Sequence, residues 1–156
     1  FVMSSVVMLL MPPTLAEKSK VAVSHVFGRY TPNAVNDGDE PDNSADVHVE
    51  RFAWFQHPGT KEWIQYAFPS PQKLSAVEVY WYQHQGCETP ESWKLLYKNG
   101  DEWKEVPDAS GYGTEIDKYN RVTFTPVEAK VLRIEVQSKK GKWSGILEWK
   151  VESVGP

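Results

Sequence analysis

The chain has 156 residues and a formal net charge of −4 at pH 7, with acidic and basic residues mixed along its length. A chain of this length suits one domain, and folding would bury roughly 70% of its unfolded surface, which is enough for a core. The charge balance offers no basic stripe for nucleic acid, so a neutral partner fits better than a polyanion. The single cysteine, Cys87, excludes an internal disulfide.

The first part of the chain is predicted to precede the domain. Residues 1–11 are apolar but too short to span a bilayer, and they lack the basic segment of a signal peptide. We therefore expect a linker or the remnant of a preceding region over 1–19, with a signal peptide as the alternative, and one domain over 20–156. The pattern VAVSHV predicts a strand over 21–26. Residues 28–44, rich in Pro, Gly, Asp and Asn, are predicted to form a long loop, a kind of segment that is usually functional or metal-bound.

Short runs of β-branched and aromatic residues, separated by turn clusters, fill the rest of the chain. They predict strands over 51–55, 62–68, 76–82, 93–97, 121–124, 131–137 and 146–152. The pair Asn99-Gly100 favours a tight hairpin turn with positive φ values. No helical period of useful length and no internal repeat is visible. About eight short strands predict an all-β fold, an antiparallel β-sandwich of jelly-roll type.

Several motifs, each weak alone, occur in a particular order: Asp37-Gly38, the strand 63–68 (WIQYAF), Lys98-Asn99-Gly100 before Trp103, Leu132-Arg133-Ile134, and Glu148 in the last strand. In this order, over about residues 20–153, the chain resembles the discoidin or coagulation factor 5/8 type C domain, close to family 32 of the carbohydrate-binding modules. The strings NDGDEP, VYW and GILEW look closest to modules at the C-terminal end of bacterial glycoside hydrolases, including β-L-arabinofuranosidase-like enzymes. The chain departs from that subgroup at Gln83 and His84, where we expect acidic residues.

The resemblance implies a non-catalytic accessory module of a secreted, periplasmic or cell-surface bacterial enzyme that degrades polysaccharide. Its partners would be a plant or host glycan and the catalytic domain of the parent hydrolase, with no nucleic acid and no membrane. The residues themselves give no support for an enzyme, because no carboxylate pair, Ser/His/Asp order, phosphate loop or Cys/His cluster stands on a recognisable scaffold.

The loop after the first strand is a candidate calcium site. Calcium takes six to eight hard oxygen ligands, which Asp37, Asp39 and loop carbonyls can supply. The resemblance adds Glu148 from the last strand and a hydroxyl near Ser44. We therefore expect a structural calcium ion that ties this loop to the last strand, with an ion-free Asx-turn loop as the alternative.

A sugar site is expected among the loops at one end of the sandwich. Sugars stack their C–H faces on aromatic rings and need planar donors and acceptors for their hydroxyls. The candidates are Trp81, Tyr82, Gln83, His84, Tyr119, Asn120, Arg121 and Trp143. Because side chains alternate along a strand, one of Trp81 and Tyr82 should point inward, with Tyr80 on the same face as Tyr82. The other tryptophans, Trp54, Trp63, Trp93, Trp103 and Trp149, are predicted to be core or edge-covering residues.

Two other functions stay open at this point. The module could pack on the parent hydrolase and stabilise it without a sugar site of its own. It could also bind protein or phospholipid, as coagulation members of the fold do, but the loops here are mainly polar, so this reading ranks last.

Overall fold

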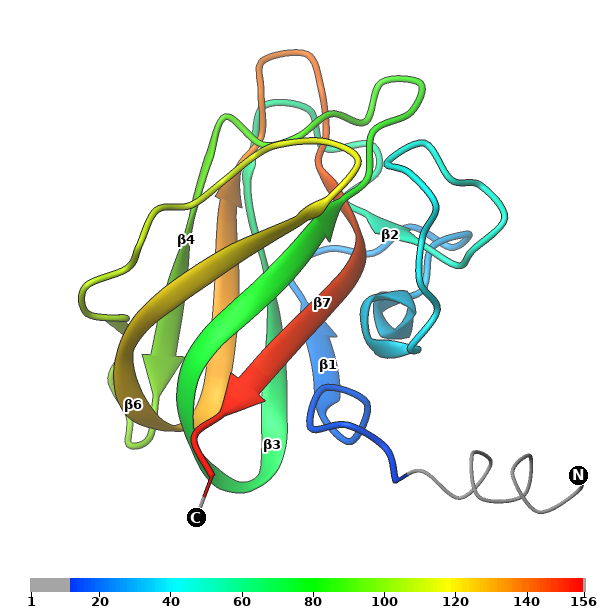
Figure 1. Cartoon of the computed structure of the whole chain (residues 1–156). Coiled ribbons are helices and arrows are strands. Elements are labelled where there is room, and N and C mark those ends of the chain that lie inside the picture. Colours follow the sequence, from blue (N-terminus) through cyan, green and yellow to red (C-terminus); the bar gives the residue numbers. More distant parts are fainter. Residues whose placement is uncertain (1–11, 156) are drawn as a thin grey trace, which may run out of the picture.

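The computed structural model describes residues 12–155, so the expectations for residues 1–11 lie outside it. Its elements are β1 (Lys20–Val23), the 3₁₀ helix η1 (Pro32–Asn36), β2 (Phe52–Ala53), β3 (Lys61–Trp81), β4 (Ser92–Lys98), β5 (Lys104–Glu105), β6 (Tyr119–Gln137) and β7 (Gly145–Ser153) (Figure 1). Within the described part of the chain, no helix is long and apolar enough to cross a membrane.

The two longest strands, β3 and β6, curve through both layers of the molecule (Figure 1). The first half of β3 pairs with β1 and with the second half of β6, which also pairs with β4. The second half of β3 pairs with β7 and with the first half of β6. The register shifts between Ala67 and Gln72, where Pro69 and Pro71 cannot donate to the ladder. All of these pairings are antiparallel, which confirms the predicted all-β sandwich.

Alternation along the strands builds the core between the layers. In the first half of β3, Ile64, Tyr66 and Phe68 are buried while the residues between them are half-exposed. The ring of Tyr66 stacks on Trp149 with centroids 3.8 Å apart, and its hydroxyl donates to the Trp149 carbonyl at 2.7 Å. The core also contains Trp54, which is fully buried. The period of two predicted for this strand is therefore confirmed.

Two of the predicted edge-covering tryptophans lie on the outer face of one layer. The Arg133 guanidinium lies over the Trp63 ring at 3.9 Å and over the Trp103 ring at 4.0 Å. Cation–π contacts of this kind hold flat rings against a sheet surface. Trp63 and Trp103 therefore cover the sheet, while Trp93 is buried with only 5% of its surface exposed.

Three local predictions were wrong. Neither Asn99 nor Gly100 has a positive φ, because the connection between β4 and β5 is long enough to turn without left-handed residues. The strand predicted over 51–55 has only two residues, and the Trp54 amide then bonds the Ser144 carbonyl. The segment predicted to be loop contains η1, which begins at Pro32, a residue pre-shaped for a first helical turn.

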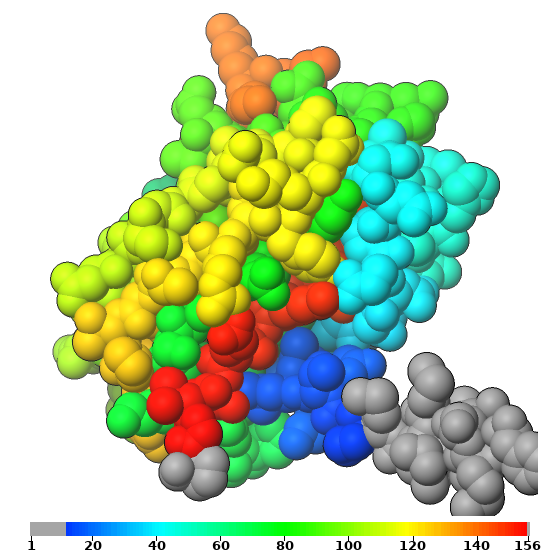
Figure 2. Space-filling model, in the orientation of Figure 1, coloured from blue at the N-terminus to red at the C-terminus, as the bar shows by residue number. Residues whose placement is uncertain are grey.

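Four connections meet at one end of the sandwich: 24–31, 54–60, 82–91 and 138–144. Backbone hydrogen bonds from Gly59 to Lys142 and from Glu88 to Trp143 join the last three of them, and the Tyr82 amide bonds the Gly145 carbonyl at the start of β7. The orange 138–144 loop projects at the top of Figure 2, above the green 82–91 connection. We call this region the loop end.

Candidate functional site

A hollow of about 280 Å³ opens at the loop end, and we call it the end hollow. It is lined by Arg29, Tyr30, Val47, Arg51, Phe55, Tyr82, His84, Gln85 and Trp143. Four of these nine residues carry aromatic carbocycles, two are arginines and none is acidic. A concave surface of ring faces with a few polar groups is typical of a site for a small polar ligand.

The indole of Trp143 is fixed in place but remains half-exposed. The Phe55 ring meets it edge-on with centroids 4.8 Å apart. On another side the indole lies against Gly86, where an added Cβ would be 2.7 Å from Trp143 Cη2. The Trp143 amide donates to the Gly86 carbonyl at 3.2 Å, and the Glu88 amide donates to the Trp143 carbonyl at 2.9 Å. The structure thus presents an aromatic ring held by its neighbours, as stacking on a ligand requires.

Arg51 and Tyr82 form a second wall of the end hollow. The Arg51 guanidinium carbon lies 5.6 Å from the centre of the Tyr82 ring. Arg51 Nη1 donates to the carbonyls of Val47 and Val49 at 3.3 and 3.4 Å, whereas its Nε is buried and has no partner among the described residues. Burial raises the pKa of Tyr82, although Arg51 opposes this, so the phenol keeps its proton at neutral pH.

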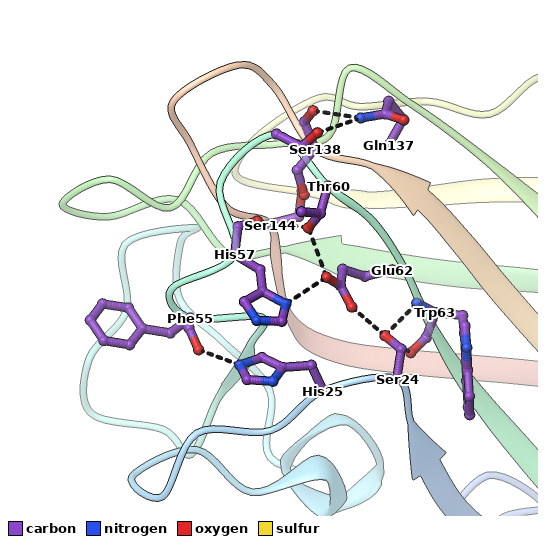
Figure 3. Close-up of polar contacts among 11 residues, drawn as sticks. Ser24, His25, Phe55, His57, Thr60, Glu62, Trp63, Gln137, Ser138 and Ser144 are labelled. Carbon is purple, nitrogen blue, oxygen red and sulfur yellow. Dashed lines mark hydrogen bonds and ion pairs between the residues drawn. The ribbon is translucent and has the colours of Figure 1, made fainter.

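Beneath the end hollow, the buried carboxylate of Glu62 collects three hydrogen bonds (Figure 3). Ser24 Oγ donates at 2.6 Å, Thr60 Oγ1 at 2.7 Å and His57 Nδ1 at 2.8 Å. Burial alone would raise the pKa of Glu62, but these hydrogen bonds outweigh it and hold the pKa below its usual value. Glu62 therefore stays ionised and ties the 24–31 and 54–60 connections to the start of β3.

The same network extends to the loop that carries Trp143, because the Ser138 amide donates to the Thr60 carbonyl at 2.9 Å (Figure 3). The His25 ring stacks on His57 with centroids 3.6 Å apart, and its Nε2 donates to the Phe55 carbonyl at 2.9 Å. The hydroxyls of Ser138 and Ser144 lie 2.8 Å apart at the two ends of the 138–144 loop. These contacts fix the connections that wall the end hollow.

The structure divides the predicted sugar-binding residues between different environments. His84 and Trp143 line the end hollow, and Tyr82 lies in its wall with only 3% of its surface exposed. Gln83 lies beside the hollow, and its backbone amide donates to the Ser44 carbonyl. Trp81 has no exposed surface, and its Nε1 donates to the Gly113 carbonyl at 3.0 Å. Trp81 is therefore a core residue, and the prediction that it contacts a sugar was wrong, because alternation sends its side chain to the inner face of β3.

Tyr119, Asn120 and Arg121 lie on a separate hollow of about 510 Å³ beside the 110–118 loop. Asn120 is buried, and its amide group bonds the backbone of Glu115 in both directions at 2.9 Å. The Arg121 guanidinium pairs with Glu152, and the Tyr119 hydroxyl donates to Glu40. Because these polar groups already have protein partners, we place the candidate site in the end hollow.

Sequence reasoning missed Arg29, Tyr30, Arg51 and Phe55. Arg51 and Phe55 were predicted to lie in a strand, and Tyr30 belongs to a segment that was considered only as a calcium-binding loop. The available signal was an aromatic residue within polar loop sequence, as at Tyr30, which is the same signal that singled out Trp143.

The predicted metal ligands Asp37 and Glu148 come together between the loop after η1 and strand β7. The Gly38 amide donates to Glu148 Oε2 at 3.2 Å, while Glu148 Oε1 is buried without a partner among the described residues. Burial, with Asp37 close by, raises the pKa of Glu148 to about 9. Burial likewise raises the pKa of Asp37. Two adjacent carboxylates and an unpartnered oxygen fit a bound cation.

The other two predicted ligands lie differently. Asp39 is exposed, and its amide donates to Asp37 Oδ1 at 2.9 Å in an Asx turn. Ser44 Oγ accepts from the Asp117 amide at 2.7 Å. In the described part of the chain, no three His, Cys, Asp or Glu side chains are placed together to hold a metal ion. Further ligands would therefore have to be carbonyl oxygens or water.

The family model of the F5/8 type C domain matches residues 19–149. The chain belongs to this family. Among solved structures, this F5/8 type C domain is similar to one of the β-galactosidase BgaA of Streptococcus pneumoniae, with a TM-score of 0.75 and 16% identity, covering 85% of this chain and 90% of that one.

Two further similar structures are carbohydrate-binding modules. The family 32 module of Clostridium perfringens NanJ, in complex with galactose, has a TM-score of 0.69 and 13% identity, covering 89% of this chain and 96% of that one. Chitosan-binding module 1 of a chitosanase/glucanase from Paenibacillus sp. IK-5 has a TM-score of 0.68 and 19% identity, covering 89% of this chain and 98% of that one. At these identities the likeness shows a shared fold.

Proposed function

We propose that this F5/8 type C domain binds carbohydrate non-covalently in the end hollow, as an accessory module that holds an extracellular bacterial glycoside hydrolase near its polysaccharide. The observation that carries the proposal is the half-exposed indole of Trp143, fixed against Gly86 and Phe55 beside polar groups of the hollow. Similar structures include modules that bind galactose and chitosan, which supports a saccharide as the ligand class. The module breaks no bond in this proposal.

The affinity of one such site should be modest. A shallow hollow loses much of its hydrogen-bond energy to desolvation of the sugar and of the polar side chains. We expect dissociation constants on the order of 10 μM to 1 mM, or roughly 4 to 7 kcal/mol.

Glycan-array screening followed by calorimetric titration of the isolated module tests this function. Trp143→Ala should weaken binding at least about tenfold, the scale of one lost aromatic contact. Trp103→Ala is the matched control, because Trp103 follows β4 at the end of the sheet away from the 138–144 loop. Unchanged binding by Trp143→Ala would contradict the placement of the site. Silence across plant and host glycans would favour the alternative, a structural domain that packs on its parent hydrolase.

We also propose that a structural calcium ion ties the loop after η1 to β7. Asp37 and Glu148 would hold it, with carbonyl oxygens of the loop, and with Asp39 and Ser44 as the less supported candidates. Burial and the nearby Asp37 favour the protonated form of Glu148, and a bound calcium ion would instead stabilise both groups as carboxylates.

A lipid surface is the third candidate, and one observation favours it. Val26, Phe27 and Val47 are 48%, 49% and 43% exposed at the loop end, so its tips are less polar than the sequence indicated. Sedimentation with anionic liposomes tests this function, and a module that stays in the supernatant excludes it.

A further inference from the structure

The charge within the end hollow is opposite in sign to that of the whole chain. The net charge is −4, yet the nine lining residues include two arginines and no carboxylate. Two acidic residues on neighbouring segments already have protein partners. Glu88 pairs with Lys139 and Lys142, each at 3.6 Å. Asp46 accepts the amides of Asp42 and His48, each at 2.9 Å, and these bonds, together with the charge of Arg51, lower the pKa of its carboxyl group.

Arg51 has an unused donor at this place. Its Nη1 donates to two backbone carbonyls, and the Tyr82 ring lies beneath the guanidinium, but its buried Nε has no partner among the described residues. Because Nε is buried, a ligand cannot reach it. The remaining terminal nitrogen, Nη2, has no hydrogen bond among the described residues and is the donor that a ligand oxygen could use. A charge-assisted hydrogen bond from a guanidinium to a carboxylate is stronger than a bond to a neutral hydroxyl. Arg29, exposed at the rim, adds a second positive charge.

Resting on the proposed function, we infer that the end hollow selects acidic saccharides, with the carboxylate of a uronic acid on Arg51 and the pyranose face against the aromatic wall. Arg29 attracts the acidic chain from the rim. A sugar that carries an amine meets two like charges here, so the inference also predicts rejection of cationic glycans.

Calorimetric titration with three trisaccharides tests the inference: trigalacturonate, its fully methyl-esterified form and chitotriose with free amines. The free acid and its ester share ring and linkage and differ in charge. The acid should bind about tenfold tighter than the ester, the scale of one charge-assisted hydrogen bond. This ratio should shrink between about 0.01 M and about 0.15 M salt, as the Debye length falls from about 30 to about 8 Å. Chitotriose should bind most weakly.

Three variants locate the effect. Arg51→Gln and Arg29→Gln should each move the acid-to-ester ratio towards one. Because Arg29 is exposed and without structural contacts in the core, its variant answers the question even if Arg51→Gln unfolds. Lys130→Gln removes the same charge from an exposed position on β6 and should keep the ratio of the wild type.

The outcomes distinguish a failure of acidic selectivity from a failure of sugar binding. Equal binding of acid and ester, a preference for the ester or for chitotriose, or a ratio that survives in both arginine variants overturns the selection of acidic saccharides by this hollow. If neutral glycans bind through Trp143 in any of those cases, the proposed function stands. If no saccharide binds at all, both the inference and the proposed function fail.

Discussion

Replacing Gly86 with alanine should weaken sugar binding more than it weakens the fold. Gly86 has a φ of +92°, a region that L-residues rarely adopt, and an added Cβ would lie 2.7 Å from Trp143 Cη2 and 2.9 Å from Cζ2. The clash is with the outer edge of a half-exposed indole, so the ring can swing away instead of straining the core. The stability cost is then mainly that of the backbone conformation, about 1–2 kcal/mol.

For a domain of this size, a cost of 1–2 kcal/mol lowers the melting temperature by roughly 2–8 °C. The displaced indole would no longer face the end hollow, and affinity for the saccharides found by glycan screening should fall at least about tenfold. Gly100→Ala is the matched control, because φ at Gly100 is not positive and no atom lies within 4 Å of its added Cβ.

Thermal denaturation followed by circular dichroism, and titration with the bound saccharide, measure the two effects separately. The reasoning is refuted if Gly86→Ala melts and binds like Gly100→Ala. It is also refuted if Gly86→Ala loses stability as expected while its affinity stays that of the wild type, because the indole position would then not matter.

Three other predictions concern the supports of the site. Hydrogen bonds hold the pKa of Glu62 below the ordinary value of 4.5, so the carboxylate stabilises the fold above that pH, and this stabilisation is lost as the pH falls through the folded-state pKa. Glu62→Gln should therefore lower the melting temperature at pH 7 and reduce the further fall of the melting temperature in acid. If calcium bridges Asp37 and Glu148, adding calcium should raise the melting temperature and a chelator should lower it, with no response in Glu148→Gln. Tyr66→Phe removes the hydrogen bond to the Trp149 carbonyl and should cost about 1–3 kcal/mol in urea denaturation.

Local patterns were sufficient to predict the layers. The alternation of Ile64, Tyr66 and Phe68 with their neighbours identified a strand with one buried face, and several such strands without a helical period identified a sandwich. What the patterns could not show was that β3 continues past Pro69 and Pro71 and that β6 continues past Pro126, since prolines usually indicate strand ends. Continuity there depends on partners far away in the chain.

The site was only partly predictable for a similar reason. Trp143 could be predicted because an aromatic residue within a polar loop has no apolar neighbours in the sequence against which its ring would pack. Arg51 and Phe55 could not, because their roles depend on four connections that meet only after folding. Burial of Trp81 likewise follows from the direction of one side chain on a finished sheet.

The net charge of a chain is a weak guide to the charge of one binding site. The sequence count of −4 favoured a neutral partner, but ion pairs such as Glu88 with Lys139 and Lys142, and Glu152 with Arg121, remove many charges from any site. A ligand responds to the groups that remain unpaired within a few ångströms, since more distant charges are screened. The residues that line the end hollow include two arginines and no carboxylate. An acidic chain can therefore carry a site for an acidic sugar.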